Sequence, residues 1–190
     1  MSADALSDLI LLLVCAAGAW VQWRNRPALA VALGLVGLAA FFGVMRFSAV
    51  PGTLGPHRFA SLLAAVAAFP LLAAALRWPD GPLATRFTAV GRFVITVGGV
   101  GILLTMMGVD WWQMAVPGLA VLVIAWTMIQ ARGALGVAGV LVLIASFAIA
   151  ATGKPDTLYL GVFNPTQAMH YTLATALALL ALQGPLREVH

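Results

Sequence analysis

Residues 134–152 read ALGVAGVLVLIASFAIAAT, a continuous apolar run without a charged side chain. A bilayer core about 30 Å thick is crossed by about 20 apolar residues in an α-helix, which rises about 1.5 Å per residue. A transmembrane β-strand would instead alternate apolar and polar residues over about ten positions. The run therefore predicts a membrane-spanning helix.

The same pattern recurs along the chain, interrupted by charged residues, Pro and Gly. Of the 190 residues, 63% are hydrophobic and 8% are charged, whereas soluble domains carry about 25% charged residues. All connections between the runs are short, so residues 1–190 are expected to form a single all-α transmembrane domain. Its seven predicted spans cover residues 5–23, 28–47, 56–77, 87–108, 112–131, 134–152 and 165–183.

Proline placement supports these boundaries. Pro27, Pro56 and Pro165 each lie at or near the start of a run, where the missing backbone N–H has no helical partner to lose. Pro70 and Pro117 lie inside runs and are expected to kink the third and fifth spans.

The N-terminal run is predicted to be a retained first span. A secretory signal peptide begins with basic residues, whereas this run begins with Asp4 and Asp8. Its Cys15 is the single cysteine of the chain, so neither an intramolecular disulfide nor a thiolate metal cluster can form.

The connections differ in positive charge, which predicts the orientation in the membrane because cytoplasmic loops are richer in Lys and Arg. These residues are scattered singly and form no basic patch, so no nucleic-acid partner is expected. We predict an outer N-terminus and a cytoplasmic C-terminus, as in a bacterial inner-membrane protein. The N-terminal side holds Arg46, Arg58 and Lys154, and the opposite side holds Arg24, Arg26, Arg77, Arg86, Arg132 and Arg187, with Arg92 inside the fourth span.

In this orientation most of the remaining polar side chains gather at the outer ends of the spans. An ionisable group inside a membrane is a candidate functional residue, because burying it in the bilayer is costly. We therefore expect an outward-facing polar pocket that binds a small ligand, a lipid headgroup or a metal, or that docks a partner subunit. Its candidate residues are Asp8, Arg46, His57, Asp110, Asn164, Gln167, His170 and Tyr171.

The last span carries the clearest polar stripe. Gln167, His170, Tyr171 and Thr175 follow one another at spacings of three and four residues, which places them on one side of a helix. His170 lies about 8 to 9 Å below the helix start at 1.5 Å per residue, and we expect it to face the bundle.

A histidine pair is the candidate metal site. His57 opens the third span and is one turn from Ser61, so His57 and His170 are expected to meet near the outer surface. Asp8 or Asp110 would supply a third ligand or a supporting carboxylate. Zinc is one candidate cofactor, and haem held between the two histidines is another.

Structural explanations compete with these roles. A membrane histidine is often hydrogen-bonded to a neighbouring helix. Arg46 and Arg58 also fit the role of interfacial anchors whose charged ends reach toward water, and Trp111 and Trp112 fit an aromatic belt.

The segment Asn164-Pro165-Thr166-Gln167-Ala168-Met169-His170, together with seven short-looped helices, resembles bacterial relatives of the alkaline ceramidase and adiponectin-receptor superfamily. That resemblance implies a zinc-dependent hydrolase of lipid amides. His170 matches a ligand position of the superfamily, whereas His57 and Ser61 occur in reversed order. Ala174 stands where a second histidine would be expected, so a carboxylate would have to complete a zinc site.

Three function classes follow. The first is an integral membrane binding or accessory protein, with a lipid or small-molecule ligand, a membrane-protein partner or a second copy of the chain. The second is the metal-dependent lipid hydrolase, with a metal-bound water as nucleophile. The third is a small transporter or channel, which would need polar or broken segments at the midplane, and the sequence offers few.

Overall fold

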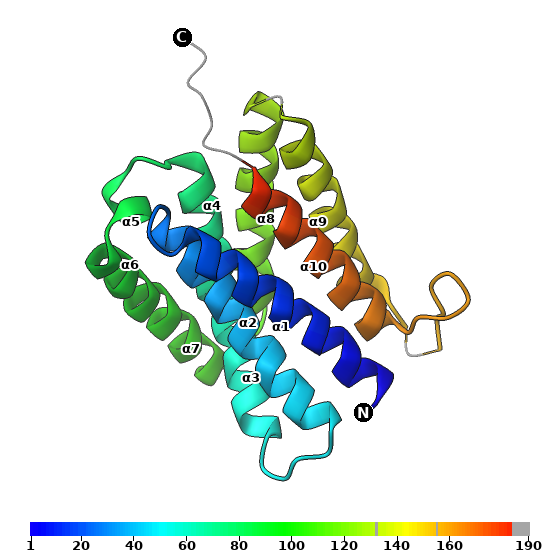
Figure 1. Cartoon of the computed structure of the whole chain (residues 1–190). Helices are drawn as coiled ribbons and strands as arrows, with labels where there is room; N and C mark the ends of the chain where they lie inside the picture. Colours follow the sequence, from blue (N-terminus) through cyan, green and yellow to red (C-terminus); the bar gives the residue numbers. More distant parts are fainter. Residues whose placement is uncertain (132, 155, 184–190) are drawn as a thin grey trace.

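The computed structural model describes residues 1–131, 133–154 and 156–183, and these residues form a bundle of α-helices (Figure 1). Outside the helices, the described chain contains an isolated β-bridge between Tyr159 and Phe163. It contains no β-strand. Arg132 and Arg187, which contribute to the predicted orientation, lie outside the described residues.

The predicted runs correspond to helices, two of which include a π-helical segment, denoted η. The elements in chain order are α1 (Ala3–Gln22), α2 (Pro27–Phe47), α3 (Leu54–Leu63), η1 (Ala64–Ala68), α4 (Phe69–Arg77), α5 (Pro82–Thr85), α6 (Phe87–Phe93), η2 (Val94–Gly98), α7 (Gly99–Met106), α8 (Trp112–Ala131), α9 (Ala134–Thr152) and α10 (Pro165–Leu182).

Among the described residues, six helical segments are long and apolar enough to cross a membrane. They are Ala3–Gln22, Pro27–Phe47, Leu54–Arg77, Phe87–Met106, Trp112–Ala131 and Ala134–Thr152. Helix α10, the predicted seventh span, is 18 residues long but is not among the six, because the polar residues of its first two turns lower its mean hydropathy. The all-α membrane fold is thus confirmed, whereas the count of seven spans stays a prediction.

The third span changes its helical pitch before Pro70. The N–H of Phe69 donates to the carbonyl of Ala64, five residues earlier, which is the π-helical pattern. Pro70 has no N–H to donate, so a wider turn at this point accommodates the gap that proline leaves in the helix. Helix α8, by contrast, continues through Pro117 as one α-helix.

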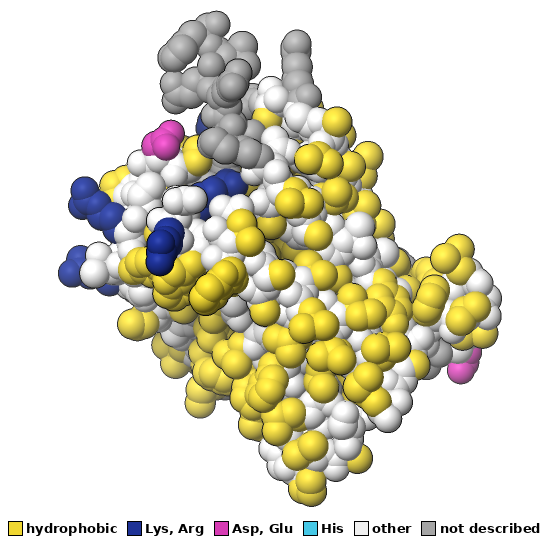
Figure 2. Space-filling view, viewed as in Figure 1, with side chains coloured by type: hydrophobic (Ala, Val, Ile, Leu, Met, Phe, Trp, Pro, Cys, Tyr) yellow, Lys and Arg dark blue, Asp and Glu magenta, His cyan; other side chains and the backbone are white. Residues whose placement is uncertain are grey.

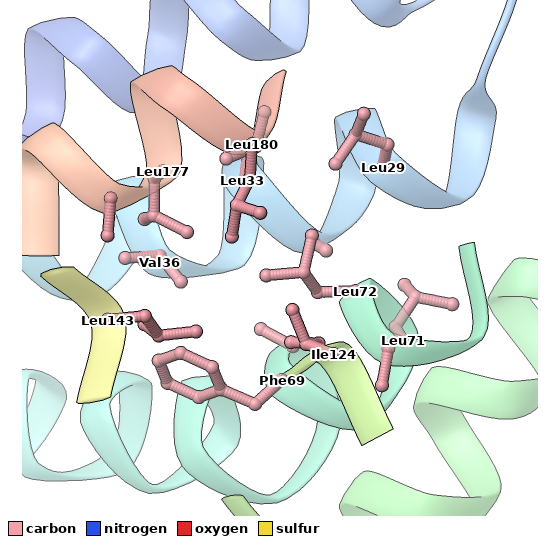
Figure 3. Packing of buried hydrophobic residues seen from close by; sticks show 14 of the residues in the cluster. Leu29, Leu33, Val36, Phe69, Leu71, Leu72, Ile124, Leu143, Leu177 and Leu180 are labelled. Atoms are coloured by element: carbon pink, nitrogen blue, oxygen red, sulfur yellow. The ribbon is translucent and has the colours of Figure 1, made fainter. Parts of the chain in front are cut away.

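The core is made mainly of leucine and alanine, and every long helical segment contributes to it, the α6–η2–α7 segment through Val90. Figure 3 shows part of this core. Leu29, Leu33 and Leu72 are almost fully buried, as are Leu143 and Leu177. On the side of α9, the ring of Phe69 packs edge-on against that of Phe147, with centroids 5.0 Å apart. Because these contacts join the first, middle and last helices, the described elements share one apolar core.

The first and last helices run parallel and are joined at both ends. At one end Asn164 donates a 2.8 Å hydrogen bond to Asp4, and at the other Gln22 donates to the carbonyl of Ala181 at 2.9 Å. Arg26 also donates to the carbonyl of Gln183 at 3.2 Å. The negative end of the α10 dipole stabilises a cation at this position. Burial lowers the pKa of Arg26 from its usual value.

The flank of the bundle is covered by apolar side chains, as Figure 2 shows for one face. Among its exposed residues, Ile95 is 76% and Leu119 is 63% accessible, which is typical of a surface that faces lipid rather than water. In the same view Lys and Arg side chains gather at the end where α4 finishes and α6 begins. The chain is therefore built as an integral membrane protein.

Close packing of the third and fourth spans depends on glycine. A Cβ atom added at Gly101 would lie 2.6 Å from Cγ2 of Val66, and one added at Gly98 would lie 2.7 Å from Cδ1 of Leu63. Gly99, one residue along, has no neighbour within 4 Å of such an atom. Small residues at helix contacts allow this approach in membranes, where packing rather than water drives association.

We expect Gly101→Ala to lower the midpoint of thermal unfolding, because Val66 is fully buried and overpacking costs about 1–3 kcal/mol. Gly99→Ala is the matched control, since both substitutions add the same helix propensity. Unfolding in mild detergent can be followed by labelling of the single buried cysteine, Cys15. Equal midpoints for the two variants would contradict the packing role of Gly101.

Candidate functional site

Helix α10 begins with a capping box that is tied to α1. The Asn164 side chain accepts a hydrogen bond from the N–H of Gln167 at 2.9 Å, and the Gln167 side chain accepts from the N–H of Asn164 at 3.3 Å. Both side-chain amides also donate to Oδ1 of Asp4 at 2.8 Å. The carboxylate of Asp4 therefore fixes the start of the last helix against the start of the first.

One turn deeper, α1 and α10 are joined by a buried polar cluster. Nδ1 of His170 lies 3.1 Å from Oγ of Ser7 and 3.5 Å from Oδ1 of Asp8. Ser7 is fully buried, Asp8 is 1% exposed and His170 is 7% exposed. Since unpaired polar groups are costly inside a bilayer, these contacts stabilise the pairing of the two helices.

The hydrogen bonds also assign the protonated nitrogen of His170. The hydroxyl of Ser7 has one hydrogen, which it donates to the carbonyl of Asp4 at 2.8 Å. With the Ser7 hydrogen on Asp4, Nδ1 of His170 is the donor to Ser7, and the nearby carboxylate of Asp8 favours the same arrangement. Nε2 is left to contact a ligand, as an acceptor in the neutral ring or as a donor in the charged ring.

The carboxyl group of Asp8 fits closely against α2 at Gly43. A Cβ atom at Gly43 would collide with the Asp8 carboxyl group, so glycine is needed for this close approach. Oδ2 of Asp8 is buried and has no hydrogen-bond partner among the described residues. A buried oxygen without a partner needs an explanation, and a bound ligand or water would supply one.

His57 approaches the same region from α3. Its Nδ1 donates to the carbonyl of Ala39 on α2 at 3.3 Å, and its ring packs edge-on against Phe47 with centroids 6.3 Å apart. The side chain is half-buried, and its Nε2 remains available to a ligand.

Asp8, His57 and His170, three of the predicted site residues, line one cavity. The inner cavity, as we call it, has a volume of about 180 Å³ and lies among α1, α2, the α3–η1–α4 span and α10. Ser61 is its fourth polar residue. The rest of its wall is apolar and consists of Leu11, Val36, Ala39, Ala40, Ala64, Ala65, Phe69, Met169 and Leu173.

A second space, the outer pocket, adjoins the inner cavity. It has a volume of about 480 Å³ and is lined by Arg46, His57, Arg58, Ser61, Leu62, Ala65, Thr105 and Gln113. His57, Ser61 and Ala65 line both spaces, so these three residues form the boundary between them. The two arginines lie at the end of α2 and the start of α3, the predicted outer end of the spans.

The other candidate residues do not line these two spaces. Asn164 and Gln167 form the cap at the start of α10 and hold Asp4. Tyr171 packs edge-on against Phe163 with ring centroids 5.3 Å apart. Asp110 is exposed in the turn before α8, so Asp8 rather than Asp110 is the carboxylate beside His170. Ligand binding by these residues stays a prediction.

Ser7 was not predicted as a member of the site, and the bonds of Asp4 to α10 were also missed. The available signal was that Ser7 directly precedes Asp8 inside an otherwise apolar run and that Asp4 lies one turn earlier. The hydrogen-bond partners of such short side chains depend on which helix packs beside them, and the sequence alone does not predict that packing.

Zinc coordination requires at least three protein ligands in a typical catalytic site. Within the described residues, no group of three or more His, Cys, Asp or Glu side chains could hold a metal ion. Asp8, His57 and His170 thus share a cavity without the close grouping that the predicted zinc centre needs.

Comparison of the chain with protein-family models, with curated proteins and with solved structures found no match.

We expect Ser7→Ala to destabilise the protein by about 1–3 kcal/mol, because it removes the buried acceptor of the His170 N–H. Ser61→Ala is the matched control, since it removes the same hydroxyl from a half-buried serine that lines the inner cavity and does not contact His170 through a hydrogen bond. Thermal unfolding in detergent compares the two variants. A loss of stability as large for Ser61→Ala as for Ser7→Ala would contradict the role assigned to Ser7.

Proposed function

We propose that this chain is an integral membrane protein that binds a small ligand. The ligand enters from the outer side of the membrane, and all or part of it occupies the inner cavity. Asp8, His57, Ser61 and His170 would provide its polar contacts. The observation that carries this proposal is that four polar residues from three separate spans line one cavity, where Asp8 Oδ2 is buried without a partner.

The proposal includes seven spans, with α10 as the seventh. Helices α1 and α10 are parallel, since hydrogen bonds join their starts to each other and their ends to each other. Two parallel spans at the beginning and end of a chain require an odd number of crossings, which supports seven rather than six.

We further propose that the chain lies in a bacterial inner membrane, where helical bundles rather than barrels are the usual architecture, and that its N-terminus lies outside. Among the described residues, Arg24, Arg26, Arg77, Arg86 and Arg92 belong to the proposed cytoplasmic side, whereas Arg46, Arg58 and Lys154 belong to the other. This excess of positive charge supports the orientation. The inner cavity then lies near the outer surface.

Binding is preferred to the other function classes on the basis of the polar groups. A metal-dependent hydrolase needs a complete ligand set, which the described residues do not assemble. A transporter would be expected to have polar groups near the midplane, whereas Asp8 and His170 lie within the first two turns of their helices.

The size of the inner cavity limits what can bind. Pockets for drug-sized ligands measure about 300–1,000 Å³, so a cavity of about 180 Å³ would enclose only a small molecule or one end of a longer one. The remainder of a longer ligand would occupy the outer pocket.

The test is co-purification of a ligand. The full-length protein is purified in mild detergent, and its bound small molecules are extracted and identified by mass spectrometry. Ala65→Leu is expected to reduce the amount of a bound compound about tenfold, because Ala65 lies on the boundary of the two spaces.

The matched control is Ala74→Leu. Like Ala65, Ala74 is half-buried, but it lines a separate apolar groove with Trp78 and Phe93. A compound present equally in preparations of the wild type and both variants would show that the inner cavity does not bind it. No specific compound in the wild-type extract would count against the proposal itself.

A further inference from the structure

We propose that the ligand is an anionic amphiphile, with a phosphate or carboxylate head in the outer pocket and an apolar stem that enters the inner cavity. This inference rests on the proposed function and specifies the chemical class of the ligand. It follows from the charge of the outer pocket and from its continuity with the inner cavity.

The outer pocket is lined by hydrogen-bond donors. Six of its eight residues have polar side chains, and none of the eight is a carboxylate. The guanidinium groups of the two arginines, the Ser61 hydroxyl and the Gln113 amide can donate to a ligand. The Thr105 hydroxyl already donates to the carbonyl of Gly101, and Nδ1 of His57 to that of Ala39. Arginine is suited to phosphate and carboxylate because its planar fork can form two parallel hydrogen bonds. This composition favours a negatively charged group.

The two arginines have no acidic partner in the described chain. The acid–base contact recorded there is the one between Asp8 and His170, and neither Arg46 nor Arg58 lies within salt-bridge distance of a carboxylate. The guanidinium carbon of Arg46 lies 5.0 Å from the centroid of the Phe47 ring, a stacked arrangement that leaves its N–H groups free to donate at their edges.

An anchor role alone does not explain this arrangement. Arginines that only anchor a helix extend separately toward the headgroups, whereas Arg46 and Arg58 come from two successive spans and line the same pocket. Both therefore bring positive charge to the wall of one space, at the predicted outer end of the spans.

The inner cavity suits the other end of the ligand. Its wall is mainly apolar, with Leu11, Phe69 and Leu173 among its larger side chains. At about 30 Å³ per water-sized group, its volume of about 180 Å³ has room for about six such groups. Because His57, Ser61 and Ala65 line both spaces, a short stem can pass between them along the apolar wall of the inner cavity, and a bound water would then be the partner of Asp8 Oδ2.

Binding of three soluble probes to the full-length protein in maltoside micelles tests this assignment. Hexyl phosphate carries both head and stem, inorganic phosphate carries only the head, and hexanol carries only the stem. Isothermal titration is expected to give a Kd for hexyl phosphate at least tenfold below that of either other probe. If micelles that contain phosphatidic acid compete with hexyl phosphate for the protein, a bilayer lipid can supply the anionic head. If they do not compete, the ligand is a single-chain amphiphile.

Arg46→Gln and Arg58→Gln are each expected to weaken hexyl phosphate binding at least tenfold and to leave hexanol binding unchanged. Arg77→Gln is the matched control, because Arg77 also ends a helix and stacks on the next residue, with its guanidinium carbon 5.6 Å from the centroid of the Trp78 ring. It should bind hexyl phosphate like the wild type.

Three results would overturn the inference. Equal affinity for hexanol and hexyl phosphate, unaffected by the arginine variants, would exclude an anionic head but would leave a ligand-binding inner cavity. Equal affinity for inorganic phosphate and hexyl phosphate would exclude the stem. A wild-type protein that binds no probe but retains a co-purified compound sensitive to Ala65→Leu would exclude the amphiphile class while the proposed function stands.

Discussion

The arrangement of the bundle depends on how the first and last helices satisfy their polar groups inside an apolar environment. Asp4 accepts hydrogen bonds from the cap of α10, and His170 contacts Ser7 and Asp8 one turn deeper. A bilayer offers no water to replace these partners. The cluster is therefore a strong constraint on the register of α1 against α10, whereas contacts between leucine and alanine could tolerate a shift.

This constraint also explains why the inner cavity holds polar groups at all. A leucine in place of Asp8 or His170 would suit the apolar surroundings, and the structure must accommodate the carboxyl group by placing glycine at position 43. Polar groups that need several accommodating residues are expected at functional sites rather than at sites of simple packing. The unpartnered Oδ2 of Asp8 fits a site that is completed by a bound molecule, either a water or a polar group of a ligand.

Much of this architecture follows from the sequence, and the remainder depends on contacts between helices. Continuous apolar runs predict the spans because the bilayer fixes their length, and loop charge separates the polar side chains by membrane side. That reasoning predicts the common location of Asp8, His57 and His170. It does not predict Ser7, whose short side chain shows no preference until α10 lies beside it, nor that Tyr171 packs on Phe163 instead of lining the cavity. The resemblance to the alkaline ceramidase and adiponectin-receptor superfamily also stays a prediction.

The π-helical segment η1 links the helix-breaking proline to the inner cavity. Pro70 cannot donate a backbone hydrogen bond, and the turn before it widens so that Phe69 bonds to Ala64. Ala64 and Ala65 belong to this wider turn and line the inner cavity, where their small side chains leave space that larger residues would fill. A regular helix with leucine at these two positions would close the passage beside Ser61. The position of one proline and the small size of two alanines thus determine whether this span packs tightly or leaves a cavity.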